Sequence, residues 1–170
     1  VLLNADDTIV YVASEGSNIV SAIDVASGKR TDIPTDTRPR RFAMTPDGKE
    51  LWVSTELAGK VDLIDVATDK VTGSIDFLPP GMRKQDVSPV ALVMDKDGKT
   101  AFVTLGRANH IGVVDVKARK VTGYILVGSR PWGITFDKAQ KRIFVANGGS
   151  DDISIIDVAS RKVLKSVPVG

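Results

Sequence analysis

Arginine is the residue type in this chain that is best suited to bind a charged partner, and two arginines occur in equivalent settings. Arg38 directly precedes Pro39, and Arg130 directly precedes Pro131. A guanidinium group binds carboxylates and phosphates through paired hydrogen bonds. We therefore predict a cationic rim at one opening of the molecule, which would bind a small anionic ligand or an acidic protein partner. Its candidate residues are Arg38, Arg40, Arg83, Arg107, His110, Arg130 and Trp132. The alternative is that these side chains bond to carbonyl groups of neighbouring segments or stay solvated.

No combination of residues in the sequence is typical of a catalytic or metal site. His110 is the only histidine and cysteine is absent, so thiolate metal sites and covalently attached c-type haem are excluded. There is no nucleophile elbow, no zinc-binding H-E-x-x-H motif and no phosphate-binding glycine loop. We therefore predict no catalytic residue, no metal and no cofactor.

Four aspartates recur in the phrase I-D-V-A-[ST]-x-[KR] or a close variant of it. They are Asp24, Asp65, Asp115 and Asp157, spaced 41, 50 and 42 residues apart. A ring of carboxylates could suggest a metal site. Each aspartate, however, stands at a strand end before a turn, where its side chain can accept backbone N–H groups. We predict turn capping.

An aromatic residue recurs with the same spacing upstream of these aspartates. The positions are Tyr11, Trp52, Phe102 and Phe144. Short runs with alternating apolar residues, separated by turn residues, predict four strands in each repeat. A period of about 40–45 residues with four strands is typical of a β-propeller blade. The predicted fold is all-β: a propeller of four-stranded antiparallel blades, here nearly four of them.

We treat residues 1–170 as one domain, with a partial blade at 1–37 and further blades at 38–78, 79–128 and 129–170. The 50-residue spacing reflects an insertion at 79–86. The strand order places the turns between second and third strands, the links between blades and this insertion at one end, which we call the top face. Predicted strands lie near 9–13, 19–25, 40–45, 50–55, 60–66, 70–77, 90–95, 100–104, 110–116, 120–126, 132–136, 142–146, 152–158 and 162–167.

The repeated phrases resemble the YVTN family of β-propeller repeats. The phrase at 144–147 matches the aromatic-Val-x-Asn signature, and Pro46-Asp47-Gly48-Lys49 matches the P-D-G-K turn. The resemblance implies a seven-bladed propeller, of which this chain is a segment. The repeat sequences are most similar to those of propellers associated with PQQ-dependent alcohol catabolism, and this resemblance implies a periplasmic protein.

We therefore expect a non-catalytic binding or interaction propeller linked to quinoprotein alcohol catabolism. One alternative is a lactonase-like or haem d1-like propeller whose site lies in blades outside this chain. Another is binding of single-stranded nucleic acid through Arg38, Arg130 and Trp132. With 23 basic and 21 acidic residues, the net charge of +2 does not by itself indicate a polyanion partner. The longest apolar run, 90–94, is far shorter than the ~20 residues of a membrane span.

Overall fold

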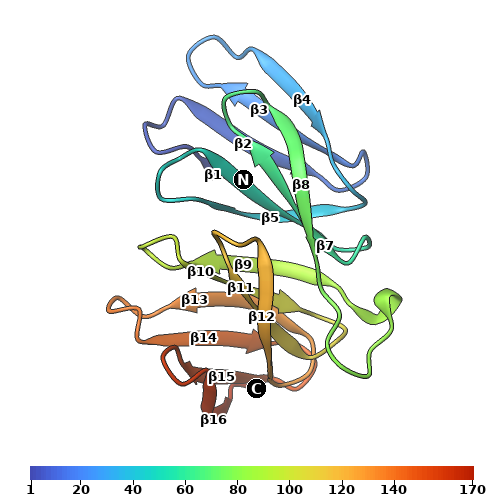
Figure 1. The fold of residues 1–170 in the computed structure, drawn as a ribbon, viewed down its shortest axis with the longest axis vertical. Coiled ribbons are helices and arrows are strands. Elements are labelled where there is room, and N and C mark those ends of the chain that lie inside the picture. The colour runs from blue at the N-terminus through green and yellow to red at the C-terminus, as the bar shows by residue number, and fades with distance from the viewer.

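The structure, a computed structural model, describes residues 1–170 and consists of four antiparallel sheets (Figure 1). Each sheet contains four strands in chain order, so each is one propeller blade. The blades follow one another from the blue N-terminal end at the top of Figure 1 to the red C-terminal end at the bottom. The predicted all-β propeller is confirmed.

The four blades are built from sixteen strands. Blade 1 contains β1 (Leu2–Leu3), β2 (Ile9–Ser14), β3 (Ile19–Asp24) and β4 (Arg30–Pro34). Blade 2 contains β5 (Pro39–Met44), β6 (Glu50–Thr55), β7 (Lys60–Asp65) and β8 (Lys70–Asp76). Blade 3 contains β9 (Pro89–Met94), β10 (Thr100–Leu105), β11 (His110–Asp115) and β12 (Lys120–Leu126). Blade 4 contains β13 (Pro131–Phe136), β14 (Arg142–Asn147), β15 (Asp152–Asp157) and β16 (Lys162–Pro168).

All fourteen strand ranges predicted from the sequence correspond to observed strands. Strand β4 was not among them, because its sequence R-T-D-I-P is mostly polar and only Ile33 is buried. Strand β1 is only two residues long and still pairs with β2, which completes the first blade. The only helix is a single 3-10 turn, η1 (Lys84–Asp86), within the insertion.

The hydrophobic core lies between the blades rather than within one of them. Three clusters of buried residues fill the three interfaces between successive blades. Leu63 of β7 faces blade 3, while the neighbouring Ile64 faces blade 1, because successive side chains of a strand point to opposite faces. The middle strands of blades 2 and 3 are thus buried on both faces.

Blade 4 departs from this pattern on one face. The alternation of apolar residues in the third strand of each blade predicts that Ile153 and Ile155 of β15 are buried between blades, as Ile111 and Val113 are in β11. Both are only half-buried. The reason is that no further blade of this chain packs against that face of the sheet.

The turns behave as predicted at all four repeated aspartates. The Oδ1 atoms of Asp24, Asp65, Asp115 and Asp157 accept the N–H group three residues later at 2.7, 2.8, 2.8 and 2.7 Å. At three of the turns a Ser or Thr hydroxyl donates to the same oxygen, and these bonds lower the pKa of the aspartate. These residues are therefore turn caps.

Candidate functional site

The two predicted rim arginines that precede a proline are placed by a backbone device that repeats. Arg38 and Arg130 have positive φ values of 65° and 53°, in the left-handed region that few residues with a side chain adopt. Their N–H groups donate to the Oδ1 atoms of Asn18 and Asn109, both at 2.9 Å. Each asparagine ends the top turn of the preceding blade. These hydrogen bonds between successive blades thus fix the backbone position of each arginine.

A β-bulge follows immediately in the inner strand of each of these blades. The pairing register shifts between Pro39 and Phe42 in β5, and between Pro131 and Gly133 in β13. A bulge bends the strand and redirects a side chain. Arg40 and Trp132 occupy these bulges at equivalent positions.

A pocket of about 180 Å³ opens on the top face at this level. We call it the mouth pocket, and it is lined by Arg38, Glu56, Ser88, Val90, Gly106, Arg107, Arg130 and Trp132. Four of the seven predicted rim residues therefore meet around one opening, which draws on blades 2, 3 and 4. Trp132 is 37% exposed, so part of its ring is open to solvent.

The other three predicted residues do not line the mouth pocket. Arg40 is largely buried, with its side chain only 13% exposed. Arg83 pairs with Asp86 in the insertion, with Nε 2.7 Å from Oδ2. His110 donates from Nδ1 to the carbonyl oxygen of Ala108 at 2.6 Å, and the edge of one ring meets the face of the other between His110 and Tyr124.

Two glutamates, neither predicted from the sequence, supply the negative charge at the mouth. Arg38 Nε lies 3.2 Å from a carboxylate oxygen of both Glu15 and Glu56. Arg40 Nη1 lies 2.7 Å from Glu15 Oε2, and Arg40 Nε lies 3.5 Å from Glu56 Oε2. Glu56 is 8% exposed, and its Oε2 atom accepts no well-directed hydrogen bond. A buried carboxylate oxygen without a directed hydrogen bond can accept one from a bound water or ligand.

The repeat explains why the mouth is charged unevenly. Glu15 and Glu56 stand at the same place in their blades, four residues after the repeated aromatic. The equivalent residues in blades 3 and 4 are Gly106 and Gly148. The ion pairs of the mouth accordingly involve Arg38 and Arg40 but not Arg107 or Arg130. The aromatic spacing could have revealed this, because only three glutamates occur in the chain.

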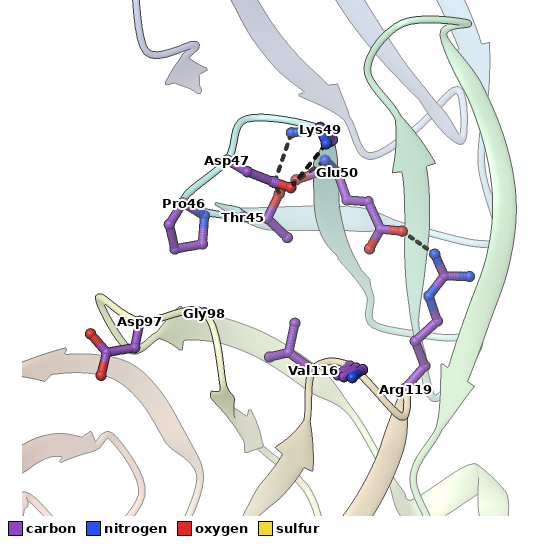
Figure 2. A pocket seen from close by; sticks show the side chains of 10 residues that line it. Thr45, Pro46, Asp47, Lys49, Glu50, Asp97, Gly98, Val116 and Arg119 are labelled. Carbon is purple, nitrogen blue, oxygen red and sulfur yellow. Dashed lines mark hydrogen bonds and ion pairs between the residues drawn. The ribbon is translucent and has the colours of Figure 1, made fainter.

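A second cavity, of about 410 Å³, lies on the opposite, bottom face between blades 2 and 3 (Figure 2). Several of its polar side chains bond to one another or to neighbouring residues. Arg119, from the turn after β11, pairs with Glu50 (Figure 2). Trp52 Nε1 donates to the other oxygen of Glu50 at 3.1 Å. Thr45 and Asp47 bond to each other across the β5–β6 turn at 2.7 Å. None of the residues that line this cavity has a buried polar atom without a hydrogen bond, whereas Glu56 of the mouth pocket has one, so the mouth pocket is the better candidate site.

No group of three or more His, Asp or Glu side chains is placed to hold a metal ion. None of the helical segments is both long and apolar enough to cross a membrane.

Solved structures with the same fold are enzymes and proteins of unstated activity. The chain is 22% identical to a hydrazine synthase structure from Kuenenia stuttgartiensis, with a TM-score of 0.85, covering 96% of this chain and 47% of that one. It is 23% identical to the periplasmic gluconolactonase PpgL of Pseudomonas aeruginosa, with a TM-score of 0.84, covering 99% of this chain and 53% of that one. A protein from Lactobacillus plantarum is 20% identical, with a TM-score of 0.83, covering 99% of this chain and 54% of that one.

These similarities establish the fold, and the chain spans about half the length of the structures that it matches. A comparison with curated proteins gives no significant match.

A protein-family comparison corrects the expected function. The model of the family described as "Lactonase, 7-bladed beta-propeller" matches residues 1–166. The expectation of a non-catalytic binding propeller linked to quinoprotein alcohol catabolism is therefore wrong, and the lactonase-like alternative is the better supported one. The sequence had favoured a non-catalytic role because it contains no recognisable catalytic motif. The chain belongs to the lactonase family of seven-bladed β-propellers.

Proposed function

We propose that the mouth pocket is the part of a lactone-hydrolysing site that this chain supplies, with Glu56 as the general base. The observation that carries the proposal is the Glu56 carboxylate itself. It is 8% exposed, lines the pocket, and keeps one oxygen without a directed hydrogen bond. The family match supports the reaction class.

The chemistry that this geometry supports is the attack of water on the ring ester. Glu56 takes a proton from the water while the water oxygen bonds to the carbonyl carbon, and the carbonyl oxygen becomes an oxyanion. Arg38, which lines the pocket with its Nε 3.2 Å from Glu56, is placed to stabilise that negative charge. The ring C–O bond then breaks, the proton passes to the leaving alkoxide, and a hydroxy acid results.

The unpaired side of the mouth indicates what else the substrate carries. Arg107 and Arg130 line the pocket, and neither is neutralised by a glutamate of its own blade. We infer that they bind an anionic group of the substrate and the carboxylate of the hydroxy acid product. Because exposed charges are screened over ~8–10 Å, affinity should fall as the salt concentration rises.

Replacing one arginine tests this anion-binding role. Arg130→Ala should weaken product binding by at least ~10-fold, as measured by calorimetry with a hydroxy acid, because it removes a charge-assisted hydrogen bond. Lys141→Ala is the control, since Lys141 follows the β13–β14 turn on the bottom face. Equal effects of the two changes would refute a local anion site.

The general-base role is tested with two isosteric changes. Glu56→Gln should lower kcat for lactone hydrolysis by ~10²–10⁴-fold, because the amide cannot accept the proton. Glu50→Gln is the matched control, since Glu50 lies in the bottom cavity, and it should leave kcat within about twofold. If Glu56→Gln hydrolyses lactones at the wild-type rate, the proposed function is wrong.

We further propose a periplasmic location and a YVTN-type repeat. The repeat phrases at 144–147 and 46–49 support the second, and the periplasmic gluconolactonase among the structural neighbours supports the first. Fractionation of cells that express the protein tests the location.

A further inference from the structure

Arg40 and Trp132 meet across the mouth although they belong to blades 2 and 4. The guanidinium carbon of Arg40 lies 4.7 Å from the centroid of the Trp132 ring, within the range of a cation–π contact. Both residues occupy the bulge that follows the proline of an inner strand. The bulge residue of the intervening blade is the smaller Val90, which lines the mouth pocket. The contact therefore spans the width of one blade.

The same guanidinium group also contacts the two glutamates. Its Nη1 donates to Glu15 Oε2 of blade 1 at 2.7 Å, and its Nε lies 3.5 Å from Glu56 Oε2 within blade 2. Arg40 thus joins side chains from three of the four blades. With 13% of its side chain exposed, it is far less accessible than Arg38, whose side chain is 42% exposed.

We propose that Arg40 and Trp132 form a positioning pair that holds Glu56 in its reactive orientation. The proposal rests on the proposed function, in which Glu56 is the base. Glu56 Oε2 accepts no directed hydrogen bond, so the nearby positive charges set its direction. Because Arg38 is open to solvent and Arg40 is largely buried, Arg40 is the better-fixed of the two charges.

Trp132 fixes Arg40 because a planar guanidinium stacks on a flat indole face. The contact with the ring limits rotation of the guanidinium group, so Nε stays 3.5 Å from Glu56 Oε2 while Nη1 holds Glu15. A shift of about 1 Å in a catalytic group can cost ~10²-fold in rate. Trp132 also lines the mouth pocket, but as the support of Arg40 it acts on the turnover step rather than on binding.

The kinetic test separates positioning from binding. Trp132→Leu should lower kcat about tenfold and leave KM within about twofold, while Trp132→Phe, which keeps an aromatic face, should recover most of kcat. Arg40→Met should lower kcat to a similar extent. The double variant Trp132→Leu/Arg40→Met should be no slower than the slower single variant, because both changes remove the same interaction.

A fluorescence measurement tests the contact without using activity. Trp52, the only other tryptophan, is fully buried, so quenching by acrylamide reports on Trp132. Arg40→Met should raise the quenching constant, because it uncovers one face of the ring. An unchanged quenching constant overturns the contact.

The outcomes distinguish the two proposals. If Glu56→Gln is inactive while Trp132→Leu retains full kcat, the positioning pair is refuted and the proposed function stands. If Trp132→Leu raises KM alone, Trp132 binds substrate and does not position Glu56, which also overturns the pair. If Glu56→Gln is fully active, the proposed function is refuted, and the positioning pair, which rests on it, is refuted as well.

Discussion

Asp62 and Asp65 lie on the same strand, β7, and are expected to change stability with pH in opposite directions. Asp62 is 1% exposed, and burial is the main cause that raises its pKa to about 6. Its Oδ2 accepts the N–H of Asp36 at 2.7 Å, while its Oδ1 has no partner. The charge of Asp36 raises this pKa further, and that of Lys60 lowers it. Asp65 is a partly exposed turn cap whose pKa is lowered by its bonds to Thr68.

The magnitude for Asp62 follows from its two protonation states. The folded protein binds this proton more tightly than the unfolded chain does, whose aspartates titrate near 3.8. The contribution of Asp62 to stability is therefore fully present below pH 3.8 and is lost as the pH rises through about 6. A shift of about 2 pKa units corresponds to ~3 kcal/mol, as an upper limit. The side chain introduced by Asp62→Asn does not titrate. The unfolding free energy of the variant minus that of the wild type should therefore rise by up to this amount between pH 3 and pH 8.

The assay is urea unfolding of three proteins at half-unit pH steps. The quantity compared is the difference in unfolding free energy between variant and wild type, because the other carboxylates then cancel. Asp65→Asn should show the opposite trend. It should be less stable than the wild type at neutral pH, and the gap should close as the pH falls below about 4. A difference for Asp62→Asn that stays flat from pH 3 to pH 8 would refute a buried, proton-binding carboxylate.

Two further predictions concern the core. Gly112→Ala should destabilise by ~1–3 kcal/mol in urea unfolding, because the added Cβ would lie 2.7 Å from two ring carbons of Phe77, whereas Gly123→Ala has open space and should be near neutral. Equal stabilities would contradict the packing of Phe77 on β11. Ile111→Ala should cost ~2–5 kcal/mol, and Ile155→Ala clearly less, because only Ile111 is fully buried. A larger cost at Ile155 would show that its outer face is covered.

Most of the fold could be predicted because the same physical signals occur once in every blade. Alternating apolar residues, turn aspartates and aromatics in register identify the strands and their order. Strand β4 was not predicted because its sequence is mostly polar, and it forms a strand through its pairing with β3. The half-buried Ile155 was misjudged because burial depends on a neighbouring blade, which a pattern within one strand cannot report.

The geometry of the candidate site was predicted less completely, because it arises from differences between repeats. Arg38, Arg107, Arg130 and Trp132 were placed correctly around one opening by the strand order alone. The stacking of Arg40 on Trp132 depends on two bulges, which residue alternation does not reveal. Glu56 was overlooked as part of a turn, since its burial and its arginine partners appear only when the blades are assembled.

The glutamate-or-glycine position after each repeated aromatic has a consequence for how such a protein can diverge. Codons for glycine and glutamate can differ by one nucleotide. A Cβ at Gly148 would have no closer neighbour than the carbonyl oxygen of Arg130 at 3.9 Å, so the backbone accommodates the exchange. A single base change could therefore place a carboxylate beside Arg130 and leave the core between the blades untouched. Selection can thus retune ligand preference one blade at a time, at little cost to foldability.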